Sequence, residues 1–320
     1  MRVMVTGGLG VNGAWVVRAL LARGHEVAVF ENRDDTSLIE DVAAKVEVVI
    51  GDICDAGHLT DAVSRLRAEC VIHLAACVDC ERDPDKAISV NVGGTAKVCA
   101  AAVAAGVRRV VYTSSKAVYA PAIGERGFPA YTPVREDDDL RPTGMYGITK
   151  AAAENVLAWY GRNADIECVS LRFATVFGPG RLQRHAGSIN TYSSMIELPT
   201  SGRAFTLEHG GDERDDIIYV VDVADAIVRV ASAPAPLRHR AYNVAHGCTV
   251  SINDFAAAIR RVIPGAVLDV GPGTDPMNMP DPYYMALDGA RMEEEFGWRP
   301  RFDLDSAIRH YHEFVRSRPS

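Results

Sequence analysis

Residues 2–13 read Arg-Val-Met-Val-Thr-Gly-Gly-Leu-Gly-Val-Asn-Gly, an apolar run followed at once by a glycine-rich loop. The run predicts a short buried strand, and residues 14–23 have the apolar spacing of a helix. Strand, G-x-x-G-x-x-G and helix predict a dinucleotide-binding turn, because glycines let the backbone approach a pyrophosphate and the helix N-terminus supplies free N–H groups. The predicted dinucleotide contacts in this loop are Gly7, Gly10, Val11 and Asn12.

The next predicted strand, residues 26–30, is followed by Glu31. A carboxylate at this place can bind the ribose hydroxyls of a dinucleotide and repels a 2′-phosphate, so Glu31 favours NAD over NADP. Its neighbour Asn32 is also a predicted cofactor contact. Arg33 is the one feature that points to NADP, and the charged segment 31–35 could instead be only a solvated loop.

Strand and helix patterns alternate from the N-terminus to residue 174. This alternation predicts the α/β class, with a Rossmann-type doubly wound parallel sheet that binds ligands at the carboxyl ends of its strands. One long helix, residues 84–105, is expected to be interrupted at Gly93-Gly94. Residues 175–320 are predicted to form mainly a smaller C-terminal substrate-binding portion, while segments near 214–245 return to the NAD-binding domain of residues 1–174.

The composition limits the partners of the chain. The net charge is −8 without a basic cluster, which argues against nucleic acid as a partner. No apolar run approaches the roughly 20 residues that span a bilayer, and the first strand leaves no room for a signal peptide, so no membrane association is expected. The seven scattered cysteines indicate reduced thiols in the cytoplasm, and the Cys77-x-x-Cys80 pair lacks partners at zinc spacing, so no metal is expected.

Tyr146 and Lys150 lie four residues apart at the start of an alanine-rich helical segment and therefore share a helix face. An ammonium beside a phenol favours the phenolate, which is expected to lower a tyrosine pKa from its usual value near about 10 and suit it to acid/base chemistry. Ser114 and Ser115 follow the predicted strand 109–113, where a hydroxyl can donate to a substrate oxygen. Taken alone, Y-x-x-x-K is more often a surface tyrosine beside a surface lysine, but here the glycine-rich loop and the serine pair precede it.

Further motifs follow in a fixed order: Thr6-Gly7-x-x-Gly10-x-x-Gly13, Gly51-Asp52-Ile53-x-Asp55, His73-Leu74-Ala75-Ala76, Asn91 with Gly94-Thr95, Ser114-Ser115-x-x-Val118-Tyr119, Tyr146-Gly147-x-x-Lys150, Leu171-Arg172-x-x-x-Val176-x-Gly178-Pro179-Gly180, Arg214-Asp215 before Tyr219-Val220, and Phe296-Gly297-Trp298-x-Pro300. With these motifs the chain resembles the extended short-chain dehydrogenase/reductases, the NAD-dependent epimerase/dehydratase family, over nearly its whole length. The resemblance implies NAD as cofactor, with Ser115, Tyr146 and Lys150 as the catalytic residues. The remaining predicted cofactor contacts at these motifs are Asp52, Ile53, Leu74, Ala75, Ala76, Asn91, Tyr146 and Lys150.

Departures from the family pattern bear on the reaction. Sugar-nucleotide dehydratases of the family carry an Asp-Glu pair directly after the catalytic hydroxyl residue, whereas Ser115 is followed by Lys116-Ala117. This difference argues against dehydration and leaves epimerisation or alcohol oxidation at a secondary alcohol carbon of a sugar-like or other polyhydroxy substrate. The alternatives are a sugar-nucleotide 4-epimerase with tightly bound NAD and a redox-inert NAD sensor. The complete Ser/Tyr/Lys set disfavours the sensor, which has no need of it.

Other departures bear on the substrate. Thr175 stands where sugar-nucleotide epimerases usually have Asn, Asn12 stands where the family prefers an aliphatic residue, and no Lys or Arg lies between Arg261 and Arg291. The Met- and Tyr-rich segment 276–285 suits a neutral or aromatic group better than a diphosphate, although its side chains could instead pack on the core. Arg181, Arg184 and Arg214 remain candidates for anion binding. The predicted substrate contacts are Ser115, Thr175, Arg181, Arg214, Met279 and Tyr283.

Assembly is predicted from the two helices at about 84–105 and 146–160. Both carry alanine-rich faces that allow close helix packing, and members of the resembled family commonly dimerise through these helices. The alanines on these faces are Ala100, Ala101, Ala104, Ala151 and Ala152. We therefore expect a homodimer. The alternative is that these faces only pack on the sheet of their own chain.

Overall fold

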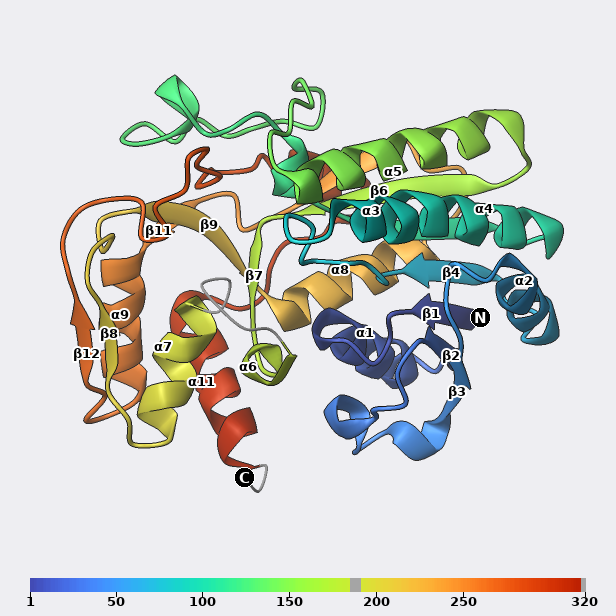
Figure 1. Cartoon of the computed structure of the whole chain (residues 1–320). Coiled ribbons are helices and arrows are strands. Elements are labelled where there is room, and N and C mark those ends of the chain that lie inside the picture. The colour runs from blue at the N-terminus through green and yellow to red at the C-terminus, as the bar shows by residue number, and fades with distance from the viewer. Residues whose placement is uncertain (185–190, 318–320) are drawn as a thin grey trace.

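The computed structural model describes residues 1–184 and 191–317. Its main element is a seven-stranded parallel sheet (Figure 1). In spatial order the strands are β10 (Ala241–Val244), β6 (Glu167–Phe173), β5 (Arg109–Ser115), β4 (Cys70–His73), β1 (Arg2–Thr6), β2 (Glu26–Glu31) and β3 (Val46–Ile50). The chain runs outward from β1 in one direction and, after β3, outward from β4 in the other. This order confirms the predicted doubly wound fold, whose ligand crevice opens between β1 and β4.

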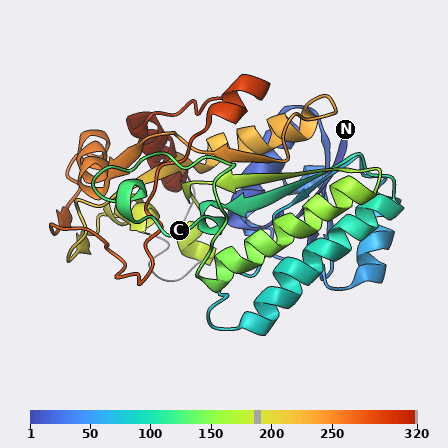
Figure 2. The same cartoon turned by 90° about the horizontal axis from the view of Figure 1, so that it is seen from above.

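Helices cover both faces of the sheet (Figures 1 and 2). On one face lie α2 (Ala56–Arg65), α4 (Thr95–Ala104) and α5 (Met145–Asn163). The other face is covered by α1 (Val11–Ala22) and α8 (Val220–Ser232), which pack against each other. Successive strand residues point to opposite faces, so a strand covered by helices on both sides needs apolar residues on both. In β1, for example, Met4 belongs to the first face whereas Val3 and Val5 belong to the second.

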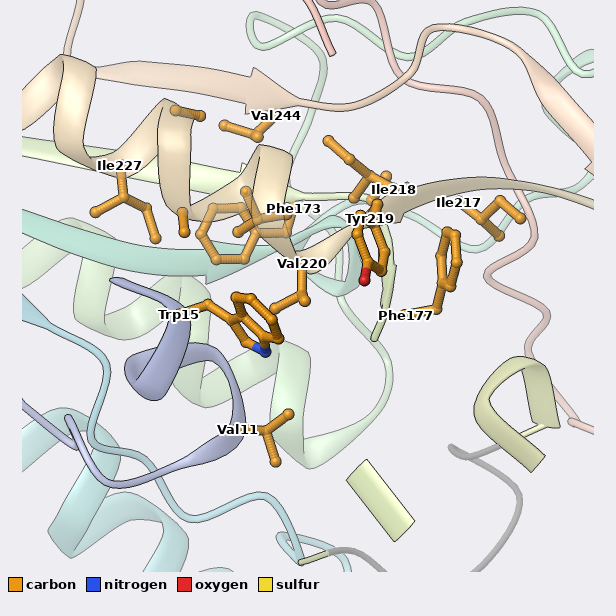
Figure 3. Packing of buried hydrophobic residues seen from close by; sticks show 14 of the residues in the cluster. Val11, Trp15, Phe173, Phe177, Ile217, Ile218, Tyr219, Val220, Ile227 and Val244 are labelled. Atoms are coloured by element: carbon orange, nitrogen blue, oxygen red, sulfur yellow. The ribbon is translucent and has the colours of Figure 1, made fainter. Parts of the chain in front are cut away.

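The second face continues into the core of the C-terminal half. In Figure 3, Trp15 of α1 lies near Val220 of α8, while Phe173 and Val244 come from β6 and β10. All four residues are at most 8% exposed. Because one apolar cluster includes residues from both halves of the chain, the N-terminal sheet and the C-terminal portion share a core rather than touching at their surfaces.

The helical segment at 84–104 differs from the expectation. Instead of being interrupted at Gly93-Gly94, the helix α3 (Pro84–Ala87) continues through a π-helical stretch, η3 (Ile88–Gly94), into α4. Gly94 is needed there because a Cβ would lie 2.6 Å from the side chain of Ile53. By length and composition alone, Pro84–Ala104 would suffice to cross a membrane. However, 44% of its most apolar window is buried inside the protein, as in a helix that covers a sheet.

The C-terminal half adds two small sheets. One pairs β7 (Thr175–Phe177), β9 (Arg214–Tyr219) and β11 (Thr249–Ser251), and the other pairs β8 (Phe205–Leu207) with β12 (Leu268–Val270). The helices of this half are α6 (Arg181–Arg184), α7 (Thr191–Thr200), α9 (Ile252–Val262), α10 (Ala290–Phe296) and α11 (Leu304–Arg316). Of the segments near 214–245, α8 and β10 pack in the large-sheet domain, whereas β9 lies in a small sheet. The substrate-binding role of residues 175–320 stays a prediction.

Short single-turn helices complete the chain. They are η1 (Ser37–Ile39), η2 (Ala43–Lys45), η4 (Lys116–Val118) and η5 (Gly124–Arg126). Residues 271–282 contain no helix or strand. The helix α9 begins at a capping box, in which the Ser251 hydroxyl accepts from the backbone N–H of Asp254 and the Asp254 carboxylate accepts from the backbone N–H of Ser251.

Candidate active site

The glycine-rich loop lies at the crevice between β1 and β4, where no side chain would fit. Gly7 has a φ of +73°, and a Cβ there would lie 2.6 Å from the backbone nitrogen of Ala75. A Cβ on Gly13 would lie 2.2 Å from the carbonyl oxygen of Gly7. Both contacts are with backbone, which cannot move aside. The turn therefore presents bare backbone at the N-terminus of α1, as a bound NAD pyrophosphate requires.

The predicted adenosine contacts lie at the carboxyl ends of β2 and β3. Glu31 is half-buried, and its Oε1 accepts from the backbone N–H of Asn32 at 2.8 Å. The carbonyl of Glu31 accepts from the N–H of Gly51, which brings the loop after β3 alongside. In that loop, Asp52 is exposed and Ile53 is buried. Glu31, Asp52 and Ile53 thus lie at one edge of the crevice, in reach of a single adenosine group.

The segment after β4 lies against the glycine-rich loop. Leu74 N–H donates to the carbonyl of Thr6 at 3.0 Å, and Ala75 touches Gly7. Asn91, which projects from the π-helical stretch, fixes the end of this segment: its Oδ1 accepts from Cys77 N–H at 2.7 Å, and its Nδ2 donates to Thr149 Oγ1 at 3.0 Å. Asn91 therefore connects the segment 74–77 to α5, although its own side chain is 1% exposed.

Tyr146 and Lys150 project from the first turns of α5 towards the end of β5. The Lys150 ammonium is buried, donates to the carbonyl of Thr113 at 2.7 Å and lies 5.7 Å from the centre of the Tyr146 ring. Gly147 makes this approach possible, because a Cβ there would lie 2.1 Å from the carbonyl oxygen of Ala117. The predicted pairing of phenol and ammonium on one helix face is thus present, directly beside the strand that ends in Ser115.

The electrostatics of this pair differ from the expectation. Burial raises the pKa of Tyr146 to about 12 and lowers the pKa of Lys150 to about 8, because a buried site disfavours both charged forms. In the protein without cofactor the pKa of Tyr146 is therefore raised rather than lowered, contrary to the expectation. Arg181 is the group that lowers the Tyr146 pKa, and its effect is smaller than that of burial.

The two serines at the end of β5 have different surroundings. Ser114 is buried and donates to a carboxylate oxygen of Glu154 at 2.5 Å. Glu154 in turn forms a buried ion pair with Arg172. The proton of the Ser114 hydroxyl is therefore used in a hydrogen bond inside the core. Ser115 is half-buried, and its Oγ accepts from the backbone N–H of Ala117 at 3.2 Å. Ser115 is accordingly the serine with a hydroxyl proton left to donate to a substrate.

A buried ion pair that the sequence analysis missed lies beside Ser115. Lys116 is 8% exposed and its ammonium pairs with Asp215 of β9. The second oxygen of Asp215 accepts from Thr175 Oγ1 at 2.6 Å, and the first also accepts from Met285 N–H at 3.1 Å. The predicted substrate contact Thr175 is thus part of a network that joins η4, β7, β9 and the segment before α10. The only signal in the sequence was a lysine where dehydratases have an acid.

The other predicted substrate contacts are spread out. Tyr283 lies near the site, because its hydroxyl accepts from the N–H of Thr143, three residues before Tyr146. Met279 is half-buried, and its N–H donates to Asp275. Arg214 points away, since its guanidinium binds Thr249 and Asp254 at the surface. Arg181 lies on the cofactor side of the site.

A cavity of about 270 Å³ lies between the segments 122–128 and 274–284, with Glu213 in its wall. Its lining includes none of the predicted catalytic or substrate contacts, so it does not mark the reaction centre. Among the described residues, no group of three or more His, Cys, Asp or Glu side chains is arranged to hold a metal ion.

Comparison with known proteins places this site in a family. Residues 3–245 match the NAD dependent epimerase/dehydratase family, and the chain belongs to it. The UDP-glucose 4-epimerase of Mycolicibacterium smegmatis is 34% identical over 99% of both chains. The dTDP-L-rhamnose 4-epimerase of Burkholderia thailandensis is 29% identical over 96% of this chain and 93% of its own.

Solved structures of similar proteins share the fold over the whole chain. The UDP-glucose 4-epimerase of Thermus thermophilus, in complex with NAD, has a TM-score of 0.83 and 27% identity, with 99% of both chains covered. MoeE5 in complex with UDP-glucuronic acid and NAD has a TM-score of 0.81 and 27% identity over the same shares. The protein is therefore an NAD-dependent enzyme of the extended short-chain dehydrogenase/reductase type, an epimerase or dehydrogenase, as the sequence predicted. The roles of its individual residues stay predictions.

The first prediction concerns Tyr146. Tyr146→Phe removes the proton-transferring hydroxyl and leaves the ring that packs near Lys150, so we expect turnover to fall at least about 100-fold, with unchanged folding and NAD affinity. Steady-state kinetics, thermal unfolding and NAD titration measure the three quantities. A turnover number equal to that of the unaltered enzyme, on any substrate it converts, would show that Tyr146 has no role in proton transfer.

Proposed function

We propose that the protein is an epimerase that inverts a secondary alcohol carbon of a nucleotide-linked hexose and keeps its NAD bound between turnovers. The observation that carries the proposal is the surroundings of Ser115. The hydroxyls of Ser115 and Tyr146 supply proton transfer, while the next positions hold Lys116, neutralised by Asp215, and Ala117. No acid follows Ser115 to drive the elimination of water. The site thus favours oxidation and re-reduction of one carbon.

In this reaction Tyr146 takes the proton of the substrate hydroxyl and later returns it to the same oxygen. The chemistry that NAD supplies when bound is reversible acceptance of a hydride from the carbinol carbon. Ser115 donates to the substrate oxygen and so stabilises it as the carbonyl forms and disappears. Lys150 holds its position through Thr113 and stabilises the Tyr146 phenolate. Re-reduction on the opposite face of the intermediate ketone inverts the carbon.

Support for a nucleotide-linked hexose comes from the relatives. The full-length relative at 34% identity is a UDP-glucose 4-epimerase, and the MoeE5 structure at 27% identity contains UDP-glucuronic acid. The WbmG structure from Bordetella bronchiseptica, at 25% identity, contains NAD and UDP. These ligands share a UDP group, so UDP-hexoses are the first substrates to test, and C4 is the carbon to follow.

The proposal predicts that the purified enzyme interconverts UDP-glucose and UDP-galactose. Proton NMR of the sugar resonances distinguishes the two products, and absorbance at 340 nm detects released NADH. We expect NAD to copurify with the protein and no NADH to accumulate during turnover. Stoichiometric NADH with a ketone or acid product would instead identify a dehydrogenase.

A dehydrogenase acting on a substrate without a nucleotide is the second candidate. It is favoured by the lack of Lys and Arg between Arg261 and Arg291 and by the engagement of Arg214 with Thr249 and Asp254, since both remove basic groups expected on a diphosphate. The same absorbance assay with free sugars, sugar acids and aromatic alcohols tests it. Micromolar affinity for UDP in calorimetry would rule it out in favour of the nucleotide-sugar epimerase.

We further propose that the enzyme is a homodimer that pairs through η3, α4 and α5. The exposed large apolar side chains on these elements support the interface. They are Ile88, Val103, Ile148 and Trp159, at 49%, 37%, 41% and 55% exposure. Of the alanines assigned to this face, Ala100 and Ala104 are exposed, whereas Ala101 and Ala151 pack inside their own chain. The interface is thus built around larger side chains than the alanine pattern suggested.

Light scattering at micromolar concentration is expected to give twice the mass of the chain. Trp159→Glu places a charge in the proposed interface and should produce monomers, because an unpaired charge is poorly tolerated in a desolvated interface. Ile123→Glu is the matched control: Ile123 is 71% exposed but lies in the loop before η5, so this variant should remain dimeric. A monomeric unaltered protein would refute the proposal.

A further inference from the structure

Arg181 is a buried arginine without an anionic partner among the described residues. It begins α6, directly after the turn at 178–180, and is 9% exposed. Its Nη2 donates to Oδ1 of Asn12 at 3.2 Å, whereas its Nε has no hydrogen-bond partner. A neutral amide oxygen is thus its one side-chain acceptor within the part of the chain that the structure describes.

Such an arrangement is unfavourable unless something else binds there. Buried charges in proteins are normally paired, because desolvation of an isolated ion is not repaid by a neutral neighbour. Burial indeed lowers the pKa of Arg181 to about 10, well below the usual arginine range. The buried arginines 109 and 172, by contrast, each face a glutamate. Arg181 is therefore one half of an ionic contact whose other half is a ligand.

The position of Arg181 identifies the ligand chemistry. Asn12 lies in the first turn of α1, where backbone N–H groups are unpaired and the helix dipole is positive. This turn has no acidic residue and no capping side chain. The turn at 178–180, which precedes Arg181, lies against the N-terminus of α1, since a Cβ on Gly180 would be 3.8 Å from the Val11 side chain. Helix terminus and guanidinium thus converge on one place, and both favour a phosphate group.

We propose that Arg181 binds the pyrophosphate of NAD at the N-terminus of α1, beside the glycine-rich loop, and that Asn12 orients its guanidinium for this contact. With Nη2 held by Asn12, the remaining N–H groups of the planar guanidinium can bind phosphate oxygens in pairs. Asn12 occupies a position where the resembled family prefers an aliphatic side chain, which cannot accept this hydrogen bond. Arg181, assigned from the sequence to the substrate, is thereby assigned to the cofactor.

The contact has a consequence for cofactor exchange. Arg181 follows β7, which lies outside the seven-stranded sheet, so NAD would be held between the large-sheet domain and the segment after β7. Release of NAD then also requires the contact between Arg181 and the pyrophosphate to break. Slow release suits an enzyme that re-reduces its own intermediate. The inference rests on NAD binding alone and stands whichever substrate the enzyme uses.

Calorimetric titration of NAD into nucleotide-free protein tests the proposal. Arg181→Gln should weaken NAD binding about 10- to 100-fold, the usual effect of losing a hydrogen-bonded charge. Arg181→Lys should weaken it less, because a lysine keeps the charge but loses the paired geometry. Arg203→Gln is the matched control: Arg203 is exposed, and NAD affinity should not change. Asn12→Val should produce a smaller loss than Arg181→Gln.

Two further measurements separate the alternatives. Without nucleotide, Arg181→Gln should melt no lower than the unaltered protein, because it removes an unpaired buried charge. A melting temperature lowered by several degrees with unchanged NAD affinity would mean a structural role and overturn the proposal. UDP titrated into the NAD-loaded variant should bind as it does to the unaltered enzyme. Lost UDP binding with full NAD affinity would assign Arg181 to the substrate diphosphate instead. If Arg181→Gln does not fold, the same titrations of NAD and UDP into Arg181→Lys decide between the cofactor and the substrate role.

Discussion

The site depends on the contact between the loop after β1 and the loop after β4. Gly7 approaches Ala75 so closely that a methyl group at Gly7 would overlap the backbone. This contact lies at the bottom of the crevice between β1 and β4, where the direction of the strand order reverses. A second close approach, of Gly147 to Ala117, brings α5 to the end of β5. The first contact shapes the loop that is predicted to bind NAD, and the second places Tyr146 at the end of β5. Two glycine contacts thus fix the relation between the predicted cofactor loop and the predicted catalytic residue.

Three of the buried cations, Lys116, Lys150 and Arg181, lie near these loops and have different partners. Lys116 is neutralised by Asp215, Lys150 is held by a backbone carbonyl, and Arg181 has only an amide oxygen among the described residues. The presence or absence of a carboxylate partner gives these cations different roles. Lys116, paired with Asp215, joins segments of the core. Lys150 and Arg181, without carboxylate partners among the described residues, leave positive potential on the predicted cofactor side of Tyr146. That potential favours both an anionic dinucleotide and a tyrosine phenolate, although burial opposes the phenolate in the absence of cofactor.

Local patterns explain what the sequence predicted well. The strands and the glycine-rich loop are determined by neighbouring residues. Apolar runs predict the strands, and the glycine spacing, as at Gly7 and Gly13, predicts the turn. Tyr146 and Lys150 share one helix face, so their proximity also follows from spacing. The family assignment followed from the order of many such local motifs along the chain.

What the sequence did not predict depends on contacts between distant segments. Lys116 meets Asp215 across 99 residues, and Arg181 meets Asn12 across 169. The helix continues through Gly94 as a π-helical stretch that packs closely on Ile53, where the glycine pair had predicted a break. The pKa of Tyr146 depends on how deeply the finished fold buries it, which spacing to Lys150 does not reveal.

The proposed epimerisation oxidises and re-reduces one carbon in the same active site without releasing the cofactor. Conversion of UDP-glucose deuterated at C4, with the product and the nucleotide pool followed by mass spectrometry and NMR, distinguishes this route from net oxidation. We expect the deuterium to stay at C4 of the UDP-galactose formed and free nucleotide to carry none. Loss of deuterium from C4, into solvent or into released NADH, would refute this route.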